Sequence, residues 1–180
     1  RGFSAPVILD RKTDAAEQAF LLAHDTDPFN KWEAGRALSR NTLIALAADG
    51  TTPDPGFLDG LSAVAGDTSL DPAFRALVLR LPSEDDIAQG LFDAGHCPDP
   101  LAIPHSTKTL RQTIAAHLKP SLVGLLSAAR VDGPYSPAAT DAGQRSWFLT
   151  LLGLAAQLDG GASARQVFDD ADNMTLTQGA

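Results

Sequence analysis

A capping residue followed directly by proline recurs along this chain of 180 residues. The pairs are Asp27-Pro28, Asp54-Pro55, Asp71-Pro72, Asp99-Pro100 and Ser136-Pro137. An Asp or Ser side chain can accept hydrogen bonds from the free N–H groups of a helix's first turn. Proline suits the first helical position because its missing N–H would be unpaired there anyway. Apolar residues at helical spacing follow the pairs, so the sequence predicts an all-α protein.

The stretch that follows Asp27 is predicted to be the longest clear helix and a part of the core. Phe29 and Trp32 are three residues apart and share a face, and Arg36 lies one turn further, where its guanidinium can stack on the indole. Gly50 supplies the end of the helix. We expect Phe29 and Trp32 on the inner face, with neighbouring helices on both sides.

The other predicted helices follow from the same start and stop signals. Thr13 can cap a first helix, with Phe20, Leu21 and Leu22 facing inward, and Ser83 with Asp86 makes a near capping box. Pro104 is expected to interrupt one helix, and Pro120 to restart another. By residue number, the predicted helices are 14–23, 54–66, 71–81, 84–94, 99–117 with the break, a segment from 120, 136–160, 162–170 and a last one beginning at 172–175.

The spacing of the helix starts suggests a repeat-like array. Asp27 and Asp71 lie 44 residues apart, and Asp54 and Asp99 lie 45 apart. HEAT and armadillo repeats run to about 40–47 residues, but the next start, Ser136, breaks the spacing. We therefore predict an irregular α-solenoid, HEAT- or armadillo-like, of about eight helices. A short extended segment at 3–9 is the only β-like part.

Composition excludes several classes of protein. The net charge is -8 and the pI is near 4.7, which argues against a nucleic-acid surface. The longest apolar run is too short to span a bilayer, so no membrane contact is expected. The single cysteine precludes an internal disulfide framework and fits a reducing compartment. With no secretion signal, a cytoplasmic location is expected, and the start without Met predicts an excised domain.

No cluster of residues in the sequence predicts a metal or catalytic site. The histidines are His24, His96, His105 and His117, and no two are three or four apart, as a pair on one helix face requires. The acidic clusters at 84–86 and 169–172 fit solvated helix ends. Cys97 beside His96 has some thiolate character, which keeps a small cysteine enzyme open as a minor hypothesis. We expect no catalytic, cofactor-binding or metal-binding residue.

Five separated segments resemble, in order, one family: bacterial aminopeptidase N, the alanyl aminopeptidase type of gluzincin. The segment Arg1-Gly2-Phe3-Ser4-Ala5-Pro6-Val7 resembles the end of that family's small β domain. The aromatic-rich segment Asp27-Pro28-Phe29-Asn30-Lys31-Trp32-Glu33-Ala34 resembles the opening of its C-terminal helical domain. The other three segments are 81–83, 99–103 and 172–175. The sequence departs at Pro104-His105, where the family usually continues as uninterrupted helix.

The resemblance implies that 1–12 end a preceding β domain or linker, and that 13–180 form the first part of the helical domain, truncated at its C-terminal end. It implies a cytoplasmic zinc aminopeptidase as parent, which removes N-terminal residues from peptides. The family's H-E-x-x-H and G-A-M-E-N motifs belong to an earlier domain and are absent here, so this segment needs no cofactor of its own. Its expected partners are the parent's catalytic domain and peptides, and a cut segment is expected to self-associate. The alternative is a free-standing helical scaffold that binds a protein partner.

Overall fold

The computed structural model describes residues 14–131, 134–171 and 174–180, and within them the chain forms nine helices and no strand. This confirms the all-α prediction. The extended segment at 3–9 and Thr13 itself lie outside the described residues. The predicted cap at Thr13 was wrong, because the N-cap of the first helix is Asp14, whose carboxylate accepts from the Ala16 N–H at 3.3 Å. The helices are α1 (Ala15–His24), α2 (Pro28–Asp49), α3 (Pro55–Gly66), α4 (Pro72–Val78), α5 (Glu84–Asp93), α6 (Ala102–Ala128), α7 (Ala139–Asp159), α8 (Ala162–Asp170) and α9 (Met174–Gly179).

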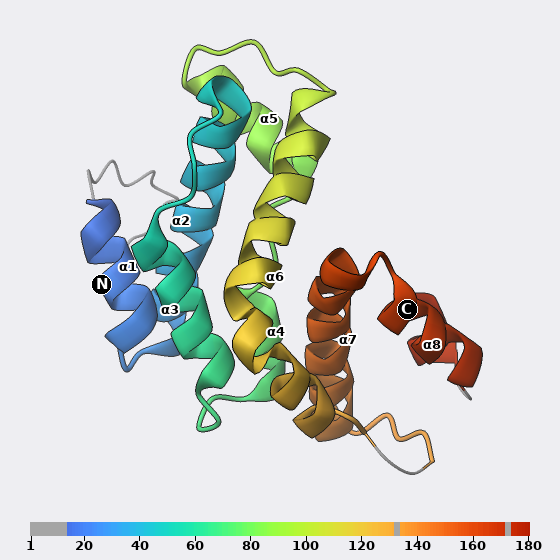
Figure 1. The fold of residues 1–180 in the computed structure, drawn as a ribbon. Helices are drawn as coiled ribbons and strands as arrows, with labels where there is room; N and C mark the ends of the chain where they lie inside the picture. Colours follow the sequence, from blue (N-terminus) through green and yellow to red (C-terminus); the bar gives the residue numbers. More distant parts are fainter. Residues whose placement is uncertain (1–13, 132–133, 172–173) are drawn as a thin grey trace, which may run out of the picture.

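The helices pack as an extended array in which α6 links the two ends (Figure 1). At the N-terminal end, α1 packs on both α2 and α3. In the middle, α6 contacts α2, α3 and α5 on one side and α7 on the other. At the C-terminal end, α7 contacts α4, α8 and α9. Neighbours in sequence are mostly neighbours in space, as an α-solenoid requires.

The proline-associated caps are confirmed for three helices. Backbone N–H groups donate to the Asp27, Asp54 and Asp71 carboxylates at 2.8 Å, each from two residues ahead. The capping box of Ser83 and Asp86 is present at the start of α5. The two later signals were placed too early: α6 begins at Ala102, and α7 at Ala139, with no side-chain cap on either helix.

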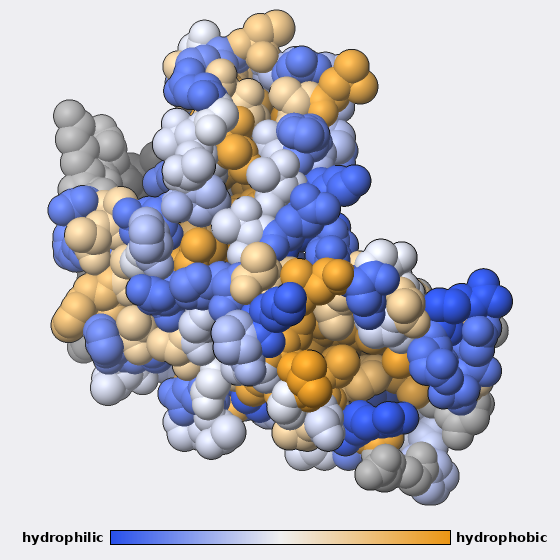
Figure 2. Space-filling model, in the orientation of Figure 1, coloured by the Kyte–Doolittle hydropathy of each residue, from blue (hydrophilic) through white to orange (hydrophobic). Residues whose placement is uncertain are grey.

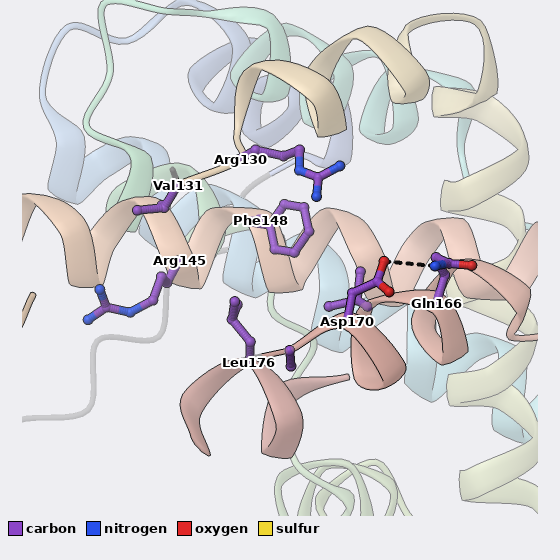
Figure 3. A pocket seen from close by; sticks show the side chains of 9 residues that line it. Arg130, Val131, Arg145, Phe148, Gln166, Asp170 and Leu176 are labelled. Atoms are coloured by element: carbon purple, nitrogen blue, oxygen red, sulfur yellow. Dashed lines mark hydrogen bonds between the residues drawn. The ribbon is translucent and has the colours of Figure 1, made fainter. Parts of the chain in front are cut away.

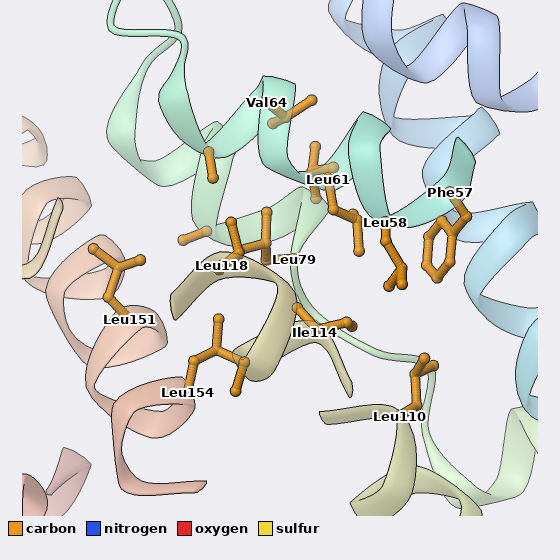
Figure 4. Close-up of a cluster of buried hydrophobic side chains, with 14 of the residues drawn as sticks. Phe57, Leu58, Leu61, Val64, Leu79, Leu110, Ile114, Leu118, Leu151 and Leu154 are labelled. Atoms are coloured by element: carbon orange, nitrogen blue, oxygen red, sulfur yellow. The ribbon is translucent and has the colours of Figure 1, made fainter. Parts of the chain in front are cut away.

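The buried core extends from α1 to α7, and one part of it lies between α3, α6 and α7. Figure 4 shows leucines and valines from these three helices pointing toward one another, with Leu79 from the end of α4 among them. Leu61, Leu118, Leu151 and Leu152 are at most 2% exposed. Each such side chain, when fully buried, contributes roughly 1.5–3 kcal/mol relative to full exposure. The apolar second half of α7 is thus explained by its burial among several neighbours.

The predicted breaks at Pro104 and Pro120 were wrong, because α6 runs through both prolines. Pro104 is the third residue of the helix, in the turn whose N–H groups have no intrahelical partner. Pro120 lies in the interior and removes one hydrogen bond. Its neighbours Leu118 and Leu122 are buried, so packing holds the helix together there. At 27 residues α6 is longer than α2, which has 22, so the prediction of the longest helix was also wrong.

Two phenylalanines were placed on the wrong faces. Phe29 is 66% exposed, and Phe20 is 63% exposed. The core face of α2 instead carries smaller residues such as Ala34, Gly35 and Leu38, which let α1 approach closely. Trp32 is half-buried at the rim of the core. The predicted stacking is confirmed, since the Arg36 guanidinium carbon lies 5.6 Å from the Trp32 ring centroid.

Candidate binding groove

A groove runs along the array beside the connection between α4 and α5. It consists of three adjoining hollows, of about 530, 340 and 320 Å³, which all share Leu81. One hollow lies against α6, the second reaches across to α7, and the third extends to Trp32 and Arg36 of α2. Because three hollows adjoin here, the groove is a natural place for a ligand.

The local fold explains the shape of the groove. Helix α4 is only seven residues long and ends at Val78, and the buried Leu79 then anchors the connection to the core. Arg80 is exposed, and Pro82 with Ser83 starts α5. On the α7 side, Gly153 is exposed, and a Cβ there would meet no atom within 4 Å. Because glycine has no side chain, the groove is open to solvent at this position.

Positive side chains outnumber negative ones along the groove. Arg36, Arg80, Lys108 and Arg111 line it, against Glu84 and Asp86. Asp86 is already engaged, because hydrogen bonds from the Ser83 side chain and backbone lower the pKa of its carboxyl. The basic character also appears in the sequence of α6, which contains no Asp or Glu in a chain of net charge -8.

A smaller pocket of about 140 Å³ lies between α7, α8 and α9 (Figure 3). Phe148, Val167 and Leu176 give it apolar walls. Two of its polar side chains hydrogen-bond within the chain, although Arg145 Nε is buried without a hydrogen-bond partner. The Gln166 amide donates to the Asp170 carboxylate at 2.7 Å, and Arg145 Nη1 donates to the Ser136 carbonyl at 2.8 Å. The arrangement favours a packing defect between helices over a reactive site.

The residues singled out from the sequence for chemistry are not brought together. Within the described ranges, no group of three or more His, Cys, Asp or Glu side chains could hold a metal ion. Cys97 is exposed. His117 Nε2 lies 3.0 Å from Asp59 Oδ1 and links α6 to α3, a structural contact at the surface.

Sequence reasoning missed the basic groove. Arg80 is far from Lys108 and Arg111 in the chain, and only the fold brings them to one concavity. The signal that could have found it is the lack of acidic residues throughout 102–128.

Among the described residues, no helix is both long and apolar enough to cross a membrane.

Comparison with known proteins identifies relatives over most of the chain. The family model described as "Domain of unknown function (DUF3458_C) ARM repeats" matches residues 15–180, which confirms the armadillo-like array. The chain is 39% identical to "Aminopeptidase N" of Caulobacter vibrioides over 149 residues, covering 81% of this chain and 17% of that protein. It is 33% identical to "Aminopeptidase N" of Escherichia coli K12 over 131 residues, covering 70% of this chain and 15% of that protein.

A solved structure shares the fold. The chain superposes with a TM-score of 0.79 on the crystal structure of Legionella pneumophila aminopeptidase A in complex with aspartic acid. The match covers 99% of this chain and 22% of that chain, at 23% sequence identity. This chain therefore spans less than a quarter of the length of each of these proteins.

Proposed function

The chain belongs to the DUF3458_C family of ARM-repeat domains, and from that premise we propose that it is a non-catalytic helical cap segment of an aminopeptidase N. The observation that carries the proposal is the 39% identity to the Caulobacter vibrioides aminopeptidase N, over 81% of this chain but only 17% of that protein. The described part of the chain consists of packed helices and contains no group of three or more His, Cys, Asp or Glu side chains that could hold a metal ion. Such a segment suits a structural role beside a catalytic domain.

In this proposal the chemistry belongs to another part of the same polypeptide. The parent is a cytoplasmic metallopeptidase whose zinc activates water for attack on the first peptide bond. This segment packs on the catalytic domain and restricts which peptides reach the cleft. Its own residues supply no metal ligand, cofactor contact or catalytic group.

The first experiment measures chemistry in this chain alone. The purified chain is dialysed against trace zinc, and bound metal and hydrolysis of an aminoacyl anilide are recorded. We expect no stoichiometric zinc and no turnover, because no helix carries two histidines one turn apart. One zinc per chain with chelator-sensitive turnover would contradict the non-catalytic assignment.

The second experiment tests the partner. The catalytic part of the parent and this chain, produced as separate polypeptides, are expected to copurify in a one-to-one complex. Recovery of the two as independent monomers at all concentrations would refute the packing on which the cap depends.

A free-standing scaffold for a protein partner remains the second candidate. The apolar surface that Figure 2 shows where α6 meets α7 favours it, because contiguous apolar patches usually mark an interface. Such a surface also predicts self-association of the isolated chain, which light scattering over a concentration series measures. A genomic reading frame with H-E-x-x-H upstream of this segment favours the cap instead.

A further inference from the structure

We propose that the groove beside 79–83 binds carboxylate groups of a polypeptide, with Arg80, Lys108 and Arg111 as the anion contacts. The proposal needs only the groove and holds whether the chain is a cap or a free-standing scaffold.

The three basic side chains converge on adjoining hollows. Lys108 and Arg111 line the hollow against α6, and Arg80 and Arg111 line the one that reaches α7. Lys108 and Arg111 are three residues apart on α6 and therefore share a face. Arg111, which lines both hollows, is the central contact.

These cations are available to a ligand. All three residues are exposed, and none forms an ion pair with another residue in the described part of the chain. By contrast, Arg36 at the end of the groove lies 3.9 Å from Glu33, and Arg40 on the same helix lies 3.7 Å from Asp93. An arginine offers a planar fork of N–H donors that matches the two oxygens of a carboxylate.

The surroundings favour a polypeptide over a nucleic acid. Leu81, Pro82 and Pro104 give the hollow against α6 an apolar side. No aromatic residue lines this hollow or the one that reaches α7, and Trp32 lines only the third hollow. Single-stranded nucleic acids bind largely by stacking bases on aromatic side chains, which the first two hollows lack. An acidic peptide needs only local positive charge, since more distant charges are screened beyond about 8 Å at physiological salt.

Fluorescence anisotropy with short labelled peptides tests the proposal. One peptide carries glutamates inside a neutral sequence and has an amidated C-terminus; a second has glutamines in their place; a third is neutral with a free C-terminal carboxylate. We expect the glutamine peptide with its amidated end to bind least tightly. Binding of the first peptide assigns the site to side-chain carboxylates, and binding of the third assigns it to a chain terminus.

Paired variants separate this site from general charge attraction. Arg111→Gln is expected to weaken binding of the carboxylate peptide by about tenfold or more, as loss of a charge-assisted hydrogen bond does. Lys119→Gln removes one charge from the same helix but does not line the groove, so it should leave the affinity within about twofold. Far-UV circular dichroism and thermal melts check that both variants fold.

Three outcomes would overturn the proposal. These are binding of the glutamine peptide as tight as that of both carboxylate peptides, equal losses in Arg111→Gln and Lys119→Gln, and tighter binding of an oligonucleotide than of any carboxylate peptide. None of these measurements involves hydrolysis or the catalytic domain. A negative result here therefore refutes the peptide site without bearing on the proposed cap function.

Discussion

The guanidinium carbon of Arg75 lies 4.7 Å from the ring centroid of Trp147, and both side chains are buried. Arg75 Nη1 also donates to the Ala65 carbonyl at 3.2 Å, near the end of α3. One arginine on α4 thus joins α3 to α7. Burial lowers the pKa of Arg75, while the nearby Asp67 and Asp71 oppose that shift. A cation on a desolvated indole is the arrangement in which this contact is strongest.

Trp147→Ala is expected to lower the free energy of unfolding by about 3–5 kcal/mol. The substitution leaves a cavity beside α4 and removes the indole ring on which the Arg75 guanidinium is stacked. Trp32→Ala is the matched comparison, because Trp32 is only half-buried and the guanidinium stacked on its ring belongs to the exposed Arg36. Its loss should stay below about 3 kcal/mol. Urea unfolding measures both. Equal losses would mean that Trp32 is as deeply packed as Trp147.

Gly60→Ala is expected to destabilise the fold by about 1–3 kcal/mol through overpacking. A Cβ on Gly60 would lie 2.9 Å from Leu22 Cδ2, and one on Gly35 would lie 3.1 Å from Leu22 Cδ1. Leu22 is fully buried between the two glycines and has little room to shift.

Gly124→Ala serves as the control for this substitution, because it lies within α6 and a Cβ there meets nothing within 4 Å. It should stabilise the chain by about 0.5–1 kcal/mol, the usual gain for this exchange inside a helix. The two substitutions therefore move the thermal midpoint in opposite directions. A rise with both would show that α1 is not held against α3 as described.

Ser83→Ala is expected to cost about 0.5–2 kcal/mol at neutral pH through loss of the α5 cap. Hydrogen bonds from Ser83 lower the folded-state pKa of Asp86, so the carboxylate stabilises the fold above its unfolded pKa, near 4. That contribution is lost as pH falls through the lower folded pKa. The gap between parent and variant should therefore shrink below about pH 4.

Denaturant midpoints at a series of pH values measure this effect. Ser127→Ala removes an exposed hydroxyl near the end of α6 and should show no pH-dependent difference from the parent. A gap for Ser83→Ala that stays constant down to strongly acidic pH would argue that the hydroxyl acts alone, without the carboxylate.

Local signals predicted the starts of α2, α3 and α4 but placed Phe29 on the wrong face of α2. Asp27, Asp54 and Asp71 cap helices as predicted because the capping bonds join residues two apart. Phe29 was misplaced because the choice of face depends on what packs there, and α1 approaches α2 through glycine instead. The groove could not be predicted from the sequence for a related reason. Arg80 and Arg111 line the same hollow only because α4, α6 and α7 pack together.

Substitution of the two prolines of α6 tests how the helix remains continuous at the positions where breaks were predicted. Pro120→Ala should stabilise the chain by about 2–2.6 kcal/mol, because it restores an N–H to the helix interior and places a residue of high helix propensity there. The gain is less than the roughly 3 kcal/mol intrinsic difference, since the unfolded chain regains freedom worth about 0.4–1 kcal/mol. Pro104→Ala should change stability little or lower it slightly, because an N–H in the first turn has no helical partner to regain. Chemical denaturation of both variants decides the point. A larger gain at Pro104 than at Pro120 would place the strain at the start of α6, where the break was first expected.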